Sequence, residues 1–399
     1  MDGNKGSPAG TQRKPKLSIA LQESHLLPRS LGAQWIHTML GPPLENRWVN
    51  ITADHIESIS LNPAYPAAQH LGEHSVLLPA TINAHAHLEL SQLENPLDVP
   101  SRAVSDWVAA LLAFRRSTNY DADEGIRQAL CRPELLESTL AIADIVPKDT
   151  LNVSPEGLCP PFVLPFAELI AWHKEHVDIN LPHTFGLSPH APHTVCPALL
   201  ETVIGQNVPV AMHLAETPEE LQLLRHHTGP LLAMMRRADP DYTPKSVLLG
   251  KRPMDYLQLL SAAPSALIIH GNYLDDEELQ FLAAHRETMS VVYCPRSHAY
   301  FRHAPYPLKK MLDFGVRVLL GTDSLASVPN LSLVEEMQFV LRQHPMVAPE
   351  IVYRLGTLEG AAALHLPEGF GTIQPGNFAK FAVLTKLAGS PDRFSFPEV

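Results

Sequence analysis

The chain has 399 residues, and its 30 Lys and Arg against 42 Asp and Glu give a net charge of −12. This balance argues against nucleic acid as a partner, because phosphate contacts require clusters of Lys and Arg. A hydrophobic content of 45% can fill a large core, and the length fits a barrel-sized domain with a smaller attachment. The 21 histidines are unusual, because histidine is normally scarce and is the commonest metal ligand.

The cysteines and the polar N-terminus favour a cytoplasmic protein. No CxxC pair occurs among Cys131, Cys159, Cys196 and Cys294, so neither a disulfide framework nor a cysteine-based zinc site is expected. No apolar run approaches the roughly 18 to 20 residues of a membrane span, and the first residues lack the apolar stretch of a signal peptide. We expect no membrane contact and a disordered extension over residues 1–17.

The two ends of the chain carry short strand-like patterns. Alternating stretches occur at Gln34–Thr38, Trp48–Ile51 and His55–Ser58, and the tail from Gly371 to Thr385 is strand-like again. We predict that residues 18–78 and 368–399 pair into one small β-domain.

Residues 79–367 show a different pattern, in which apolar runs recur with polar or helical stretches between them. Helical patterns include Ser105–Arg116, Pro218–His226 and Asp275–Arg286. Several runs are continuously apolar, as expected for parallel strands that are buried on both faces. Eight such units predict a (β/α)8 barrel. The runs are Val76–Asn83, Leu140–Val146, Phe162–Phe166, Thr184–Ser188, Val208–His213, Ala266–His270, Ser290–Cys294 and Arg317–Gly321.

Polar residues at the C-terminal ends of barrel strands are the usual site candidates. The first run leads into His85 and His87, and side chains two apart on a strand point the same way, so both imidazoles can hold one metal ion. The alternative is a pair of surface histidines in a loop.

Three further runs end in residues that suit the same site. His213 closes the fifth run with Glu216 three residues later, His270 closes the sixth, and Asp323 follows the eighth. Taken singly, these residues have structural alternatives: a core histidine, a helix-initial acid or a helix N-cap. Together they predict one divalent metal, Zn²⁺ first or Fe²⁺, because nitrogen and oxygen ligands suit both ions. The predicted ligands are His85, His87, His213 and Asp323.

Such a set suits hydrolysis of a C–N bond. A divalent metal with an open position lowers the pKa of bound water to about 7. Asp323 can accept the proton of the water, and Glu216 can protonate a ring nitrogen and then the leaving amine. His270 can stabilise the tetrahedral intermediate.

The motifs NAHAHLELS, SPHAPHTV, AMHLAE, IIHGNYL, CPRSHAYF and LGTDSLAS resemble the amidohydrolase superfamily, in its branch of cytosine, guanine and S-adenosylhomocysteine deaminases. The resemblance runs from about residue 33 to the end. It implies a distorted (β/α)8 barrel with a small β-sandwich built from both chain ends, the four metal ligands above, and Glu216 and His270 as catalytic residues. The fourth run has no Lys, which favours a single metal over the two-metal form. Within the branch, the motifs look most like aminodeoxyfutalosine deaminases, which act in a route to menaquinone.

Contacts with the substrate are expected around the same mouth of the barrel. The resemblance implies one for His190, while His193 and His298 replace the usual Tyr and Asn and either select the substrate or are tolerated changes at the rim. Glu89 is expected either to reach the substrate or to support His87. The substrate-binding candidates are His190, His193, Arg296, Ser297, His298 and Glu89.

The favoured hypothesis is a metal-dependent deaminase of an aminopurine nucleoside-like substrate. A second hypothesis keeps the site but changes the bond, to hydrolysis of a triazine, an amide or a cyclic urea. A third is a barrel scaffold without activity. The expected partner is a small-molecule substrate, and a homodimer is one assembly that relatives adopt, although no sequence feature fixes an interface.

Overall fold

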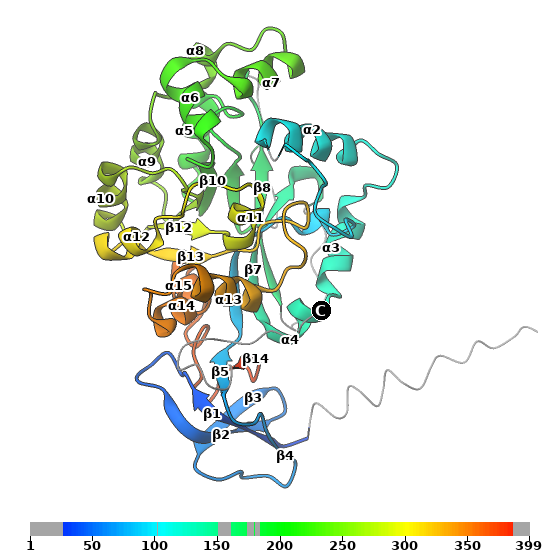
Figure 1. Cartoon of the computed structure of the whole chain (residues 1–399), viewed down its shortest axis with the longest axis vertical. Helices are drawn as coiled ribbons and strands as arrows, with labels where there is room; N and C mark the ends of the chain where they lie inside the picture. The colour runs from blue at the N-terminus through cyan, green and yellow to red at the C-terminus, as the bar shows by residue number, and fades with distance from the viewer. Residues whose placement is uncertain (1–26, 102, 151–160, 174–178, 180–183, 386–399) are drawn as a thin grey trace, which may run out of the picture.

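The computed structural model describes residues 27–101, 103–150, 161–173, 179 and 184–385, and these form an eight-stranded and a six-stranded sheet. Figure 1 shows the smaller sheet at one end of the molecule and helices α2, α6 and α7 at the other. The predicted disordered extension over residues 1–17 lies outside the described residues.

The smaller sheet joins both ends of the chain. Its order is β14-β5-β1-β2-β3, with β4 beside β1, and β14 runs antiparallel to β5. This confirms the predicted small β-domain, although the strand-like tail is a strand only over its last five residues, because a turn at Gly376 precedes it. The strands are β1 (Arg29–Ile36), β2 (Leu44–Thr52), β3 (His55–Ser60), β4 (Ala68–His70), β5 (Ser75–Pro79) and β14 (Phe381–Thr385).

The larger sheet is the predicted parallel barrel. Its strands follow chain order from β6 to β13. The barrel closes where the backbone N–H groups of Thr322 and Asp323 donate to the carbonyl of His85 at 3.0 and 3.1 Å. The strands are β6 (Thr81–Ala86), β7 (Thr139–Pro147), β8 (Phe162–Leu169), β9 (Gly186–Pro189), β10 (Val210–Leu214), β11 (Ala266–His270), β12 (Met289–Tyr293) and β13 (Val318–Leu320).

The first apolar run was predicted as a single barrel strand, and this is wrong. The run divides after Pro79, so that β5 pairs in the small sheet while β6 opens the barrel. Periodicity could not show the break, because both strands are buried along their whole length.

Helices surround the barrel, and three of them match predicted helices closely: α2, α6 and α10. Among the described residues, no helix is long and apolar enough to cross a lipid bilayer. The α-helices are α2 (Val104–Arg115), α3 (Ala122–Leu130), α4 (Pro133–Ser138), α5 (Pro197–Ile204), α6 (Pro218–His226), α7 (Pro230–Ala238), α8 (Pro244–Val247), α9 (Pro253–Leu260), α10 (Asp276–Ala284), α11 (Pro295–Tyr300), α12 (Leu308–Phe314), α13 (Leu333–Gln343), α14 (Pro349–Leu355) and α15 (Leu358–Ala363). Short 3-10 turns lie at η1 (Leu88–Leu90) and η2 (Lys148–Thr150).

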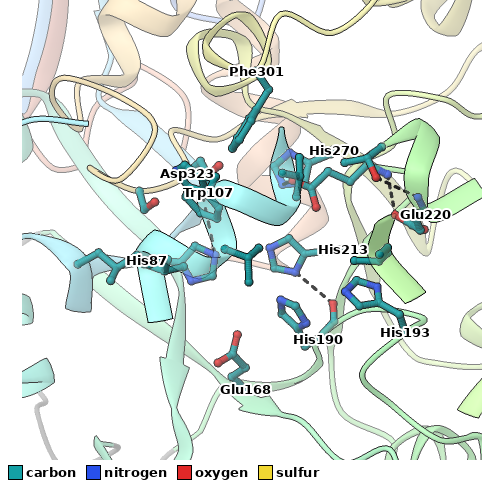
Figure 2. A pocket seen from close by; sticks show the side chains of 18 of the residues that line it. His87, Trp107, Glu168, His190, His193, His213, Glu220, His270, Phe301 and Asp323 are labelled. Carbon is teal, nitrogen blue, oxygen red and sulfur yellow. Dashed lines mark hydrogen bonds and ion pairs between the residues drawn. The ribbon is translucent and has the colours of Figure 1, made fainter. Parts of the chain in front are cut away.

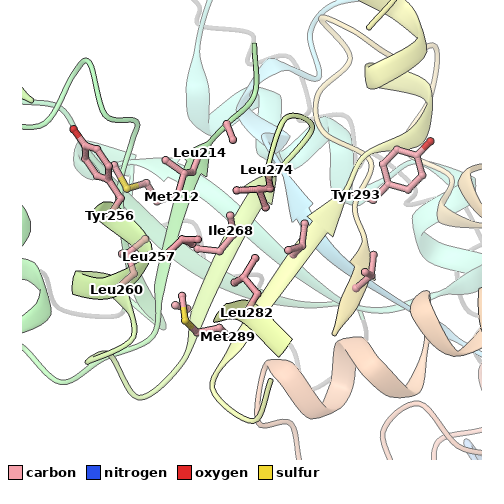
Figure 3. Packing of buried hydrophobic residues seen from close by; sticks show 14 of the residues in the cluster. Met212, Leu214, Tyr256, Leu257, Leu260, Ile268, Leu274, Leu282, Met289 and Tyr293 are labelled. Carbon is pink, nitrogen blue, oxygen red and sulfur yellow. The ribbon is translucent and has the colours of Figure 1, made fainter. Parts of the chain in front are cut away.

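The main core lies between the strands and the surrounding helices. Figure 3 shows Met212, Ile268 and Met289 from successive barrel strands beside Leu257 of α9 and Leu282 of α10. A second apolar cluster, which includes Ile82, Phe166 and Ile269, fills the barrel interior. Burial on both faces holds the strands rigidly, so the polar residues at their ends are fixed in place.

Candidate active site

Three histidines from two strand ends lie within reach of a single ion. One ring nitrogen from each of His85, His87 and His213 lies within 4.8 Å of the others, and all three side chains are buried. His85 belongs to β6, His87 follows it directly, and His213 lies in β10. Figure 2 shows His87 and His213 on either side of the same cavity, with His270 nearby.

The chemistry of these histidines fits a metal ion. Neither ring nitrogen of His85 has a hydrogen-bond partner among the described residues, although both are buried. Burial lowers the pKa of His85, His87 and His213 well below 6.5, and neighbouring histidines lower it further because they disfavour a second proton nearby. Each imidazole is therefore neutral, which is the form that binds metals. His213 Nδ1 lies 3.1 Å from the carbonyl of His190, so Nε2 is the nitrogen left to face the cluster.

Asp323 comes to the cluster through the closure of the barrel. Its Oδ1 lies 3.8 Å from His85 Nε2 and 4.0 Å from His87 Nε2. Its Oδ2 accepts hydrogen bonds from Ser297 at 2.6 Å and Ser327 at 3.2 Å. These hydroxyls fix the carboxylate so that Oδ1 faces the histidines.

Glu216 and His270 form a second pair beside the cluster. Glu216 Oε1 lies 3.6 Å from His270 Nε2, and the centroids of the His270 and His213 rings are 5.4 Å apart. Burial raises the pKa of the Glu216 carboxyl above 4.5, whereas the nearby His270 lowers it. Because His270 and Asp323 have positive φ angles of 67° and 65°, the strand ends carry local strain of the kind found at functional sites.

One cavity of about 100 Å³ is lined by His87, His213, Glu216, His270 and Asp323. Trp107 and Val108 of α2 and Phe301, which follows α11, supply apolar walls. The rings of Trp107 and Phe301 meet edge to face with centroids 5.3 Å apart, and Trp107 Nε1 donates to the carbonyl of Ala326 at 3.0 Å. Aromatic walls beside several polar groups suit a small organic molecule.

Three charged residues of the cavity were not among the sequence candidates: Arg115, Glu168 and Glu220. Burial raises the pKa of the Glu168 carboxyl, and the guanidinium of Arg115 lowers it. Figure 2 shows Glu168 pointing toward His87 and His190. The position of Glu168 near the end of a barrel strand was a usable signal, since that is where site residues gather.

Two of the six predicted substrate contacts line the cavity. His190 and His193 do so, and burial lowers their pKa to about 3 and about 4. His190 Nδ1 lies 2.9 Å from the Thr194 hydroxyl, which leaves Nε2 for the cavity. Substrate contact by these two histidines stays a prediction.

The other four predicted contacts have protein partners and lie outside the cavity lining. Glu89 pairs with Arg115, and Ser297 donates to Asp323. His298 is buried against Tyr293 and Tyr306. Substrate contact at these four positions stays a prediction, and the structure shows which protein groups they contact.

Arg296 departs furthest from its expected role. Its backbone N–H and Nε donate to Glu336 at 2.9 and 2.6 Å, and Nη1 donates to Glu335 at 2.7 Å and Asn330 at 3.0 Å. The guanidinium is therefore fully engaged with α13 and the loop before it.

The sequence profile of the amidohydrolase family matches residues 179–396, more than half of the chain. The chain belongs to the amidohydrolase family. Within this family it is 32% identical to a 5-methylthioadenosine/S-adenosylhomocysteine deaminase of Pyrococcus abyssi over 368 residues, which cover 84% of this chain and 80% of that protein. It is 28% identical to an aminodeoxyfutalosine deaminase of Deinococcus radiodurans over 332 residues, which cover 75% of this chain and 76% of that protein.

Solved structures show the same fold. The aminofutalosine deaminase of Helicobacter pylori in complex with methylthio-coformycin superimposes with a TM-score of 0.71 at 22% identity, over 92% of this chain and 93% of that chain. A triazine hydrolase superimposes with a TM-score of 0.65 at 16% identity, over 90% of this chain and 87% of that one. The fold is thus shared by enzymes whose names describe different reactions.

Proposed function

We propose that the protein is a metal-dependent hydrolytic deaminase of a 6-aminopurine nucleoside-like substrate, which replaces the 6-amino group by oxygen and releases ammonia. The observation that carries this proposal is the Glu216 carboxyl, which lies 3.6 Å from His270 Nε2 in a cavity that two of the three clustered imidazoles, His87 and His213, also line. That arrangement places a proton donor and a hydrogen-bonding imidazole next to a metal-binding cluster.

His85, His87, His213 and Asp323 would hold the metal, and zinc suits this set of nitrogen and oxygen ligands best, with iron second. A divalent ion bound there would activate a water molecule to attack the substrate carbon. Oδ1 of Asp323 is free to accept a proton from the water, because the serine hydroxyls occupy Oδ2.

Glu216 does the proton transfer on the substrate side. Desolvation raises the pKa of its carboxyl, which favours the protonated form that a proton donor needs. It donates this proton to the ring nitrogen beside the attacked carbon. Glu216 then takes the hydroxyl proton of the tetrahedral adduct and passes it to the amine, which leaves as ammonia as the C–N bond breaks, while the water oxygen stays on the ring. The proton that Asp323 accepted returns to Glu216 before the next cycle. Nε2 of His270 hydrogen-bonds the developing negative oxygen.

Among aminopurine nucleosides, we favour aminodeoxyfutalosine, and with it a place in menaquinone biosynthesis. The Deinococcus relative and the Helicobacter structure carry that activity in their names. 5-Methylthioadenosine and S-adenosylhomocysteine are the second choice, because several relatives are named for them. We place the enzyme in the cytoplasm, since Cys131, Cys196 and Cys294 are free thiols.

The test is ammonia release by zinc-loaded and iron-loaded full-length protein from aminodeoxyfutalosine, adenosine, 5-methylthioadenosine and S-adenosylhomocysteine. We expect turnover of at least one of these nucleosides. A chlorotriazine, an amide and a cyclic urea form a second arm of the panel. If the protein converts only compounds of this second arm, the proposed deaminase activity is wrong and the protein is the alternative hydrolase. If it binds metal but converts none of the compounds, an enzymatic role in either class is contradicted.

A further inference from the structure

We propose that Glu220 is a positioning residue that holds the backbone of Glu216 in its working place. The proposal rests on the proposed function, in which Glu216 moves protons. Glu220 lies in the first turn of α6, and its carboxylate is almost fully buried, with 3% of the residue exposed. Figure 2 shows dashed lines from this carboxylate to the neighbouring backbone.

The start of α6 has the sequence of a capping box, but its glutamate accepts other backbone N–H groups than a capping box would use. Thr217 is the N-cap, and its hydroxyl accepts the N–H of Glu220 at 3.0 Å. In an ordinary capping box the third helical residue then accepts the N–H of the N-cap itself. Here the carboxylate of Glu220 reaches past Thr217, so that Oε1 accepts the N–H of Ala215 at 2.8 Å and Oε2 accepts the N–H of Glu216 at 3.0 Å.

These two hydrogen bonds stabilise a strained turn between β10, which carries His213, and α6. Ala215 has a φ of 54°, a left-handed conformation that a residue with a Cβ seldom adopts. Two consecutive N–H groups that point at one carboxyl group, one at each oxygen, hold the chain in that conformation. The turn sets the direction in which the Glu216 side chain leaves the backbone.

The opposite side of the turn is held from the next barrel unit. Asn272 Nδ2 donates to the carbonyl of Glu216 at 2.9 Å, and the N–H of Tyr273 donates to the carbonyl of Ala215 at 3.0 Å. The N–H and the carbonyl of Glu216 are therefore both fixed, and its carboxyl is left to face His270. A shift of about 1 Å at such a group can cost about 100-fold in rate.

The same helix position one unit later provides an internal comparison. Glu278 is the third residue of α10, is equally buried, and also accepts two backbone N–H groups. Its carboxylate returns to the N-cap, Asp275, at 2.8 Å in the ordinary capping box and accepts the N–H of Met254 at 3.2 Å. Glu278 thus has the burial and the bond count of Glu220, but its donors lie outside the Ala215–Glu216 turn.

The experiment compares Glu220→Gln with Glu278→Gln in the metal-loaded full chain. A glutamine offers one acceptor oxygen to two N–H groups, so E220Q loosens the turn. We expect kcat of E220Q to fall about 10- to 100-fold with KM within about threefold and the metal content unchanged. The control E278Q is expected to keep the wild-type kcat, even if it melts earlier.

A double-mutant cycle separates positioning from general support of the fold. If Glu220 acts through Glu216, the double variant E216Q/E220Q is no slower than E216Q alone. Independent, multiplying losses would overturn the proposal, and so would a wild-type kcat in E220Q. If E220Q does not fold, Asn272→Ala takes its place in the cycle. The proposal then requires that Asn272→Ala lowers kcat in the wild type but causes no further loss when combined with E216Q.

A readout without turnover keeps this proposal distinct from the proposed function. In a crystal structure of E220Q we expect the Glu216 carboxylate to move by about 1 Å or more relative to His270. An unmoved carboxylate overturns the positioning role, whereas a wild-type protein that converts no nucleoside overturns only the proposed function.

Discussion

Two glutamates four residues apart show how different partners give identical side chains different roles. Both oxygens of Glu220 accept backbone N–H groups, whereas Oε1 of Glu216 faces His270. Burial raises the pKa of both carboxyls, to about 8 for Glu220. Both oxygens of Glu220 are thus occupied by backbone hydrogen bonds, whereas the carboxyl of Glu216 is left to exchange a proton with a ligand.

Glu216→Gln should abolish most activity without loss of the metal. The amide keeps the size of the side chain but cannot transfer a proton, and general acid–base catalysis contributes about 10²- to 10⁴-fold. Deamination rate and metal content of the purified variant check this. Glu219→Gln, at a neighbouring position outside the cavity lining, is the matched control. Full activity in E216Q would remove Glu216 from the mechanism.

The burial of His298 leads us to predict that mild acid lowers the stability of the fold. Burial lowers its pKa from 6.5 to about 4. The folded chain therefore binds this proton more weakly than the unfolded chain, so the stability that His298 contributes is complete above pH 6.5 and is lost as pH falls toward 4. Urea unfolding at several pH values should show a smaller loss over this window in His298→Phe than in the wild type. The exposed His226→Phe should leave the loss unchanged.

At the scale of elements, α13 supports the site through α11. Arg296 ties the start of α11 to Glu336 of α13, and the next residue, Ser297, orients Asp323. Side chains outside the cavity thus fix the position of a predicted ligand. The sequence prediction of a substrate contact at Arg296 overlooked this partner, which lies 40 residues further along the chain.

Arg296→Met should destabilise the protein strongly, by about 3 to 5 kcal/mol, because it leaves the buried Glu336 without its counterion. The apparent free energy of urea unfolding measures this. Arg252 pairs with Asp275 and Glu277 at the surface, so Arg252→Met should cost only about 0 to 1 kcal/mol. Equal losses in the two variants would contradict a structural role for the Arg296 pair.

At the scale of the whole molecule, the cluster depends on closure of the barrel. His85, His213 and Asp323 come from distant parts of the chain, and the contact between β6 and the end of β13 brings Asp323 beside His85. A metal held by them therefore binds the folded chain and not the unfolded one, and it stabilises the fold by mass action.

Chelation should lower the melting temperature reversibly. A free ion at about 1,000 times its Kd contributes about 4 kcal/mol of stability, which a chelator removes and added zinc restores. Differential scanning calorimetry with and without chelator measures the shift. His85→Ala should melt at the same temperature under both conditions. A wild-type protein that holds one equivalent of metal and shows no shift would contradict binding at this cluster.

Much of the fold followed from local pattern. Continuous apolar runs marked the barrel strands, and the histidines and acids at their ends marked the cluster, because strand ends of a parallel barrel share one face. The break at Pro79 was missed, since strands of two different sheets follow each other there and both are fully buried.

The sequence by itself determined the barrel, the family and the residues able to bind a metal, since these depend on residue type and spacing. Only the tertiary structure decided which polar side chains face the cavity. It turned Arg296 toward Glu336 and Glu89 toward Arg115, and it brought Glu168 and Glu220 to the cavity. The reason is physical: a buried charge takes whichever partner the packed fold brings within a few ångströms, and that partner is usually distant in sequence.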